Sequence, residues 1–448
     1  MRLINSIFKI LKLSGNREKV VRNVYWAVSG KVVQIASGLL VGILVARYLG
    51  PEQFGLMNYV ISYVMLFSIL ATFGLDGIEV RELSKHEADK GALLGTAFGL
   101  RLLFASIALV LILTTLILFE SDRYTFTMVM VYSVSLIFSS LNVIRNYFTS
   151  IILNEYVVKS EIARTVLGAL IKVVLLWAHC SLTWFIAASA FDIVLVAGGY
   201  VLSYRKKAPD SMAWRFDRAT AGMLIRASFP LLLSGAAIVV YQKINAIMIR
   251  NMLDNAALGQ FSAAAKLTEF STFIPMMIAQ TITPILVKVH EADSTRYLIK
   301  RQQFMDLIVW SGIGMAVAMS LLAYPAILVL YGREYASAIP VLQITAWRSI
   351  FMALAAASGQ LIIIEGLQNW VILRNLMGCV VSIGLNWWLI PVWGIHGSAI
   401  AMVLSVACAG FFSHHVIRPY RFLVPIQWRA IFTGWRSIAS AVRKRAVD

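Results

Sequence analysis

Hydrophobic residues along the chain gather into long, nearly uncharged stretches that are separated by short polar segments. A helix needs about 20 apolar residues to cross the hydrocarbon core of a bilayer, and most of these stretches approach or exceed that length. They lack the strict alternation of a barrel strand, so the pattern predicts membrane-spanning helices. Twelve segments are predicted, at 24–47, 55–76, 92–119, 126–149, 160–178, 182–204, 222–249, 257–286, 304–331, 337–364, 371–391 and 395–417.

The composition of the chain agrees with this fold class, an all-α polytopic membrane protein. Of its 448 residues, 59% are hydrophobic and only 14% are charged, whereas a soluble protein carries about 25% charged residues. This excludes a soluble enzyme, a nucleic-acid binder and a secreted disulfide domain. The three cysteines, Cys180, Cys379 and Cys408, are scattered through apolar sequence, which is typical of buried thiols and not of a disulfide framework.

The distribution of lysine and arginine predicts the orientation of the chain in the membrane. Thirty of the 40 basic residues lie in alternate loops and in the two termini, whereas the opposite ends of the helices carry only Arg47, Arg123, Arg250 and Arg333. Because basic residues concentrate on the cytoplasmic side, both termini are predicted to be cytoplasmic in a multi-pass protein of the cell (inner) membrane. Anionic phospholipids of the inner leaflet are expected partners of these charges.

The longest hydrophilic connection divides the chain into two similar halves. Ser29-Gly30 and Ser234-Gly235 lie early in the first helix of each half, and Gly55 and Gly259 open the second helix of each. Six helices per half would give a parallel repeat with a pseudo-twofold axis along the membrane normal; chance similarity between apolar helices is the alternative. The predicted organisation is an amphipathic cytoplasmic segment 1–23, an N-lobe 24–204 (helices 1–6), a cytoplasmic linker 205–221, a C-lobe 222–417 (helices 7–12) and a basic amphipathic tail 418–448.

The tail combines aromatic and basic residues at helical spacing. Trp428, Phe432 and Trp435 share one helical face, and Arg429 and Arg436 lie to one side of it. Such a helix is typical of one that lies in the membrane interface. A docking helix for a cytoplasmic glycosyltransferase is the alternative.

Sequence motifs for catalysis are absent. Gly30-Lys31 lacks the remaining residues of a phosphate-binding loop, and the six histidines form no metal-ligand spacing. No nucleophile elbow or paired-carboxylate spacing occurs either. The chain is therefore predicted not to be an enzyme and to need neither a cofactor nor a metal, which leaves transport as the favoured function.

Charged residues inside the predicted spans are the candidate functional residues. A charge at the centre of a membrane helix costs roughly 2.5–3.5 kcal/mol on insertion scales, so it usually faces a cavity or a partner. The alternatives are snorkelling of Lys31 to the inner surface and an ion pair between Lys266 and Glu269 in one helix. Cations outnumber carboxylates in these spans, which favours an anionic substrate. The residues predicted to line a substrate cavity are Lys31, Lys243, Arg250, Lys266, Glu269 and Arg348.

Three further intramembrane residues have predicted structural roles. Lys172 and Asp192 lie at similar depths in adjacent antiparallel helices, about 6 Å apart along the axis at 1.5 Å per residue, so a structural ion pair is predicted. Pro275 interrupts the eighth predicted helix. Because proline removes a backbone hydrogen bond, this position is a possible hinge, or a kink that serves only packing.

Several loop motifs resemble those of one transporter family. They are Arg47-Tyr48-Leu49-Gly50-Pro51-Glu52-Gln53-Phe54-Gly55, Gly74-Leu75-Asp76-Gly77 with Arg81-Glu82, Tyr331-Gly332-Arg333-Glu334-Tyr335, and Asn386 with Pro391-Val392-Trp393-Gly394-Ile395-His396-Gly397. In this order they resemble the polysaccharide (O-antigen, Wzx-type) flippases of the multidrug/oligosaccharidyl-lipid/polysaccharide exporter (MOP) superfamily.

The resemblance implies two six-helix lobes around a central cavity that opens alternately to each side. It implies that the substrate is an undecaprenyl-pyrophosphate-linked oligosaccharide, moved from the cytoplasmic to the periplasmic leaflet during lipopolysaccharide or other polysaccharide biosynthesis. A monomer working beside a polysaccharide polymerase and a chain-length regulator is the implied arrangement. The alternatives are a multidrug or metabolite exporter of the same superfamily and a non-transporting membrane scaffold for polysaccharide assembly.

Overall fold

The computed structural model describes residues 17–85, 89–207 and 213–447, and this part of the chain is helical, with no strand. Most of the predicted amphipathic segment 1–23 lies outside these residues. Within the described residues, nine stretches are long and apolar enough to cross a membrane. This confirms the all-α membrane fold class, while the count of twelve helices in two lobes stays a prediction.

The helices connect through short turns. In chain order they are α2 (Arg17–Thr72), α3 (Leu75–Leu83), α4 (Lys90–Phe119), α5 (Arg123–Ser133), α6 (Ser135–Ser139), α7 (Asn142–Ser150), α8 (Asn154–Trp177), α9 (Leu182–Lys207), α10 (Arg218–Met252), α11 (Asn255–Ala292), α12 (Ser294–Leu321), α13 (Ala323–Leu330), α14 (Ala338–Ala346), α15 (Arg348–Ile364), α16 (Val371–Ala407), α17 (Ser413–Val416) and α18 (Leu423–Val447).

Two of the long helices each contain two predicted segments. α2 is interrupted at Gly50, whose φ of 70° lies in the left-handed region, and α16 is interrupted at Gly394, with a φ of 55°. Glycine adopts such values without the clash that a Cβ would cause. The predicted segment pairs 24–47 with 55–76 and 371–391 with 395–417 therefore run into each other through sharp glycine bends.

Two other predicted segments contain short turns within one continuous span. Segment 126–149 comprises α5, α6 and α7, and segment 337–364 is divided into α14 and α15 at Trp347. At one inner loop the helices are longer than the predicted segments: α11 reaches Ala292 and α12 begins at Ser294. These helices extend well beyond their apolar residues into the predicted loop.

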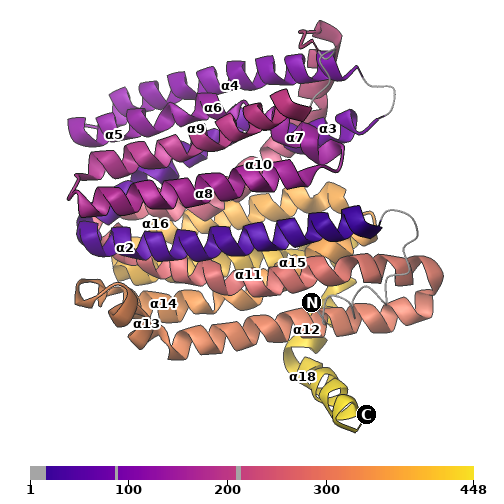
Figure 1. The fold of residues 1–448 in the computed structure, drawn as a ribbon. Coiled ribbons are helices and arrows are strands. Elements are labelled where there is room, and N and C mark those ends of the chain that lie inside the picture. The colour runs from indigo at the N-terminus through magenta and orange to yellow at the C-terminus, as the bar shows by residue number, and fades with distance from the viewer. Residues whose placement is uncertain (1–16, 86–88, 208–212, 448) are drawn as a thin grey trace.

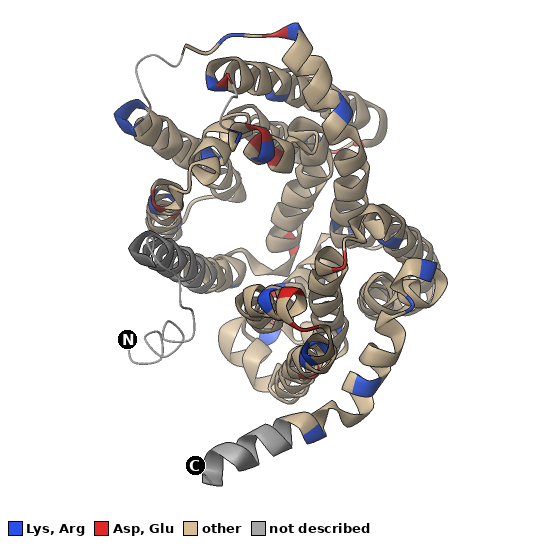
Figure 2. Cartoon of the chain, turned by 90° about the vertical axis from the view of Figure 1, so that its right-hand side faces the viewer, with Lys and Arg blue, Asp and Glu red and all other residues tan. Residues whose placement is uncertain are grey.

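The helices run side by side, so that their ends form two opposite faces of the molecule (Figure 1). The elements α4, α5, α6 and α9 lie on one side of the bundle and α11 to α15 on the other (Figure 1). The start of α4 and the linker before α10 lie together, since Arg215 pairs with Asp89. We call this end of the bundle the inner end; the bends at Gly50 and Gly394 belong to the opposite, outer end. Figure 2 looks onto the inner end, where lysine and arginine mark the ends of several helices.

The linker between the predicted halves packs against the inner end. The Trp214 indole donates a hydrogen bond to the Tyr204 hydroxyl (2.9 Å), and Arg215 pairs with Asp89. Asp217 caps the start of α10, and hydrogen bonds from the side chain and the backbone of Thr220 lower the pKa of its carboxyl. The linker is therefore held to α4 and α9 by specific polar contacts.

The first half of α18 is anchored to α12 and α15. The buried Gln427 amide donates to Ser358 Oγ (2.8 Å) and to the Gly410 carbonyl (3.0 Å), and the Trp310 indole donates to the Ala430 carbonyl (3.0 Å). Trp428, Phe432 and Trp435 remain exposed on this helix. The Trp428 indole nevertheless donates to His415 Nε2 (3.2 Å) and its ring packs against Phe411, so the aromatic face predicted for the tail is only partly separate from the face that packs against the bundle.

Truncation of the chain after Pro425 is expected to lower its abundance and its melting temperature. The truncation removes the buried amide and the Trp310 acceptor, and a buried polar group left without a partner costs ~1–3 kcal/mol. Truncation after Ser437 is the control, since it keeps these contacts and the hydrogen bond from Ser437 to Asp306. Thermal unfolding of the two purified variants measures the effect; equal melting temperatures would show that the anchor is dispensable.

Candidate functional site

Three adjoining cavities lie in the middle of the bundle, and Lys266 of α11 lines all three. The first is bounded by α2, α8, α9 and α11 and has a volume of about 380 Å³; we call it the N-side cavity. The second, of about 420 Å³, lies between α2 and α11. The third, of about 200 Å³, is bounded by α2, α10, α11, α15 and α16; we call this third one the C-side cavity.

The C-side cavity brings together four of the residues predicted from the sequence. Lys243 of α10, Lys266 and Glu269 of α11, and Arg348 of α15 all line it. Arg348 is only 8% exposed, and its Nε atom has no hydrogen-bond partner within the described part of the chain. The cavity therefore presents three cations and one carboxylate to any occupant.

The position of Arg348 follows from polar contacts between α11 and the α14–α15 pair. Thr268 and Thr345 hydroxyls are 2.8 Å apart, and so are those of Ser271 and Ser349. These hydroxyls, four or fewer residues apart on each helix, fix the register of the two elements. Arg348 begins α15 immediately after the break at Trp347.

The N-side cavity contains a second charged group. Lys172 of α8 donates to Asp192 Oδ2 of α9 at 2.5 Å, and Arg164 of α8 also lines the cavity. Arg164 lies near the start of the predicted segment 160–178, where a basic residue is typical of the positive charge at the inner ends of the helices, and it is not among the residues predicted to line a cavity. In the structure α8 begins at Asn154, so Arg164 lies well inside the helix.

The α2 face that bears Gly38 and Gly42 forms one wall of the cavities. Both glycines line the N-side cavity, and Lys266 Nζ would be 3.1 Å from a Cβ at Gly42. The absence of a side chain there makes room for the lysine. Lys31 belongs to the same helix, but its side chain lies outside the described part of the structure, so its predicted role remains a prediction.

Arg250 and Pro275 lie away from these cavities. Arg250 pairs with Glu120 at the outer end (3.0 Å), and its guanidinium carbon is 4.6 Å from the centre of the Tyr59 ring. Pro275 lies within α11, which the structure continues through this proline and through Pro284. Neither residue lines any of the three cavities described above, and the proposed cavity contact and hinge stay predictions.

Positive charge predominates in the combined cavities. Their lining includes Arg164, Lys172, Lys243, Lys266 and Arg348 against the carboxylates Asp192 and Glu269. Five cations against two anions leave a formal surplus of three positive charges in a space of low dielectric, where charges interact strongly. The arrangement suits a polyanionic group such as a phosphate or a pyrophosphate.

The outer end above the cavities is tightly closed. A Cβ at Gly55 would be 1.7 Å from the Asn255 carbonyl oxygen, and one at Gly259 would be 1.9 Å from the Pro51 carbonyl oxygen. The Tyr335 hydroxyl also donates to the Ala46 carbonyl (2.8 Å). The two glycines that occupy matching places in the predicted halves thus face each other in direct backbone contact.

Further inward, α2 and α11 separate. There Gln34 and Gly38 of α2 line the second cavity together with Glu269, Phe273 and Met276 of α11. This cavity adjoins the charged region, which lies inward of the glycine contact between α2 and α11.

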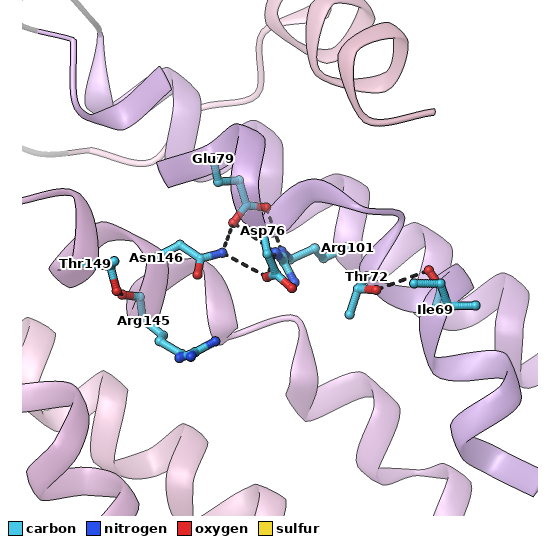
Figure 3. A network of polar contacts seen from close by, with 8 residues as sticks. All are labelled: Ile69, Thr72, Asp76, Glu79, Arg101, Arg145, Asn146 and Thr149. Atoms are coloured by element: carbon cyan, nitrogen blue, oxygen red, sulfur yellow. Dashed lines mark hydrogen bonds and ion pairs between the residues drawn. The ribbon is translucent and has the colours of Figure 1, made fainter. Parts of the chain in front are cut away.

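A second buried polar cluster lies at the inner end of the first half (Figure 3). Arg101 of α4, which is fully buried, donates to Glu79 Oε1 (2.7 Å) and to Asp76 Oδ1 (2.6 Å), and Asn146 of α7 donates to the same two carboxylates. Every charge in this cluster faces another member (Figure 3). It joins α3, α4 and α7 and is separate from the three cavities.

Comparison with known proteins shows the family. The model of the polysaccharide biosynthesis protein family matches residues 20–290, which is more than half of the chain. The chain belongs to this family. No curated protein matches its sequence significantly.

Solved structures show that this family member has the fold of MOP-superfamily transporters. The lipid II flippase MurJ, in an inward closed conformation, has a TM-score of 0.70 at 13% identity, covering 93% of each chain. An inward-facing multidrug resistance MATE family transporter of the MOP superfamily has a TM-score of 0.66 at 14% identity, covering 87% of this chain and 95% of the other. A MOP superfamily transporter from Pyrococcus furiosus, described as having a binding pocket of reverse polarity, has a TM-score of 0.56 at 12% identity, covering 90% and 96%.

Proposed function

We propose that the protein is a flippase that moves an undecaprenyl-pyrophosphate-linked oligosaccharide from the cytoplasmic to the periplasmic leaflet. The observation that carries the proposal is the surplus of three positive charges in the cavities around Lys266. A pyrophosphate supplies several acceptor oxygens and negative charges, which lysine and arginine bind through charge-assisted hydrogen bonds. The sugars would follow the pyrophosphate through the polar interior while the lipid tail stays in the bilayer.

Alternating access is the proposed mechanism. The closed glycine contact at the outer end and the separation of α2 and α11 further inward correspond to a state that accepts substrate from the inner leaflet. Movement of the two halves about the cavities would break that contact and open the outer side. Binding of the anionic group by residues from both halves, Lys172 on one side and Lys243 on the other, would couple occupancy to this movement.

The membrane setting is part of the proposal. The bias of basic residues supports cytoplasmic termini in a cell inner membrane, with anionic phospholipids against the inner end. The partners proposed are a polysaccharide polymerase and a chain-length regulator, and the protein is proposed to work as a monomer. The polysaccharide proposed to be built from this substrate is O-antigen or another lipopolysaccharide component.

Export of drugs is the second candidate, because the fold is shared with the MATE transporters. The cavities argue against a cationic drug, since its charge would meet five cations and only two carboxylates. Deletion of the gene in its own host separates the two functions. Loss of the surface glycan supports the flippase, whereas an intact glycan together with sensitivity to cationic dyes would assign the protein to export.

Replacement of Lys243 or Arg348 by alanine is expected to reduce complementation of that deletion at least tenfold. A hydrogen bond to a charged group contributes ~1.5–3 kcal/mol, which corresponds to about 10–150-fold in binding. Arg296→Ala is the matched control, because Arg296 is an exposed cation at the inner end. The measurement is surface glycan per molecule of membrane-inserted protein. Full complementation by both cavity variants at normal abundance would remove the support for a cationic cavity.

A further inference from the structure

One face of α8 carries two cations, Arg164 and Lys172, with Gly168 between them. Arg164, Gly168 and Lys172 are spaced four residues apart, so they lie on one face of the helix. All three line the N-side cavity. A substrate phosphate entering this cavity would meet an arginine and a lysine on one side of it.

Asp192 of α9 occupies the space between them. A Cβ at Gly168 would be 2.1 Å from Asp192 Oδ1, so the carboxylate fits only because residue 168 is a glycine. Its other oxygen, Oδ2, accepts the hydrogen bond from Lys172 at 2.5 Å. The carboxylate thus holds one of the two cations in a cavity-lining ion pair.

The hydrogen bonding of this group is incomplete. Asp192 Oδ1 is buried and has no hydrogen-bond partner among the described residues, and the same is true of Arg164 Nε. A buried ion pair that serves only stability needs its remaining lone pairs and protons satisfied, because desolvation otherwise outweighs the attraction. The Lys172–Asp192 pair leaves an acceptor unused, and the neighbouring Arg164 leaves a donor unused, beside the same cavity.

We propose that Asp192 is an internal counter-ion that competes with the anionic group of the substrate for Lys172, and so limits how tightly the cavity holds it. This inference rests on the proposed function, namely that the cavities receive a phosphate or pyrophosphate. In the empty protein Asp192 neutralises Lys172. When the substrate anion arrives, Lys172 and Arg164 bind it, and the repulsion from Asp192 keeps the complex weak enough to release its cargo on the other side.

The proposal predicts that tighter binding of the anionic group is accompanied by slower release. A transporter that bound its cargo with every available cation would hold it too tightly to turn over, because the release rate falls as affinity rises. Removal of the negative charge at position 192 should therefore tighten binding and slow transport. Removal of the positive charge at position 172 should weaken binding.

The test uses the full-length purified protein with farnesyl pyrophosphate as the probe and farnesol as the uncharged comparison. Asp192→Asn is expected to bind farnesyl pyrophosphate about tenfold more tightly than the wild type, a change equivalent to about 1.4 kcal/mol. Lys172→Met should bind more weakly, and Asp192→Asn combined with Lys172→Met should lose the gain. Asp89→Asn is the matched control, because Asp89 is a carboxylate at the inner end that pairs with Arg215.

A second variant tests the same proposal if Asp192→Asn fails to fold. Gly168→Ala introduces a Cβ that displaces the Asp192 carboxylate, so it should tighten probe binding without changing any charge. If neither Asp192→Asn nor Gly168→Ala binds the pyrophosphate more tightly than the wild type, the inference is wrong while the proposed function stands. If the wild type does not prefer farnesyl pyrophosphate over farnesol, the proposed function itself fails.

Discussion

Replacement of Arg101 by methionine is expected to abolish accumulation of folded protein. The arginine is fully buried and is the cation that pairs with both Asp76 and Glu79, at 2.6 and 2.7 Å. Removal of one partner from a buried ion pair costs ~3–5 kcal/mol, because an uncompensated charge stays behind. Here the buried carboxylate of Glu79 and the half-exposed carboxylate of Asp76 would remain, and the neutral amide of Asn146 cannot balance their charge.

The matched control for this variant restores the charge balance. Arg101→Met combined with Asp76→Asn and Glu79→Gln removes all three charges, so it should recover much of the abundance that the single variant loses. Detergent-solubilised protein can be followed by size-exclusion chromatography and thermal unfolding. A single variant as stable as the wild type would show that the cluster does not hold α3, α4 and α7 together.

The cluster around Arg101 shows which features the sequence pattern can predict and which it cannot. The pattern places Arg101 near the inner surface and Asp76 with Glu79 near the same end, but their pairing depends on how α3 folds back against α4. α3 begins directly after Gly74, which adopts a φ of 67°. Two consecutive residues with positive φ, Phe73 (48°) and Gly74 (67°), redirect the chain at this point, and hydrophobic periodicity carries no information about that turn.

The ionic residues of the cavities were predicted unevenly for a similar reason. Depth along a helix follows from residue counting, and this is why Lys172 and Asp192 could be placed at matching levels before their contact was known. Rotation of a helix about its axis depends on its neighbours, so counting could not predict that the same pair lines a cavity. Pairing between distant segments, such as Arg250 with Glu120, is equally invisible in a single sequence.

The boundaries of the helices also limited the prediction of the site. Arg164 lies near the start of the predicted segment 160–178, where a cation is typical of the positive charge at the inner ends of the helices. In the structure α8 begins at Asn154, and Arg164 lines a cavity inside the bundle. Lys243, Lys266 and Arg348 were identifiable because they interrupt apolar sequence and a charge there is costly. Cations nearer the helix ends look like ordinary topology signals until the packing is known.

The contact between Gly55 and Gly259 leads to the second large expected effect, which concerns access from the outer side. Gly259→Ala would place a Cβ 1.9 Å from the Pro51 carbonyl oxygen, far inside any normal contact distance, so α2 and α11 must move apart at the outer end. Overpacking of this kind costs ~1–3 kcal/mol. Only the outer-closed state bears that cost, and the population should therefore shift towards an outer-open state by about 5–150-fold.

Thiol labelling measures this shift directly. In a variant without Cys180, Cys379 and Cys408, a cysteine at Ser189, which lines the N-side cavity, is exposed to a membrane-impermeant maleimide added from the periplasmic side. Labelling should be slow with Gly259 and several-fold faster with Gly259→Ala. Gly314→Ala is the control, because a Cβ at Gly314 meets no atom within 4 Å. Equal rates in all three proteins would mean that the glycine contact does not close the path, and the transport cycle would then need a different outer barrier.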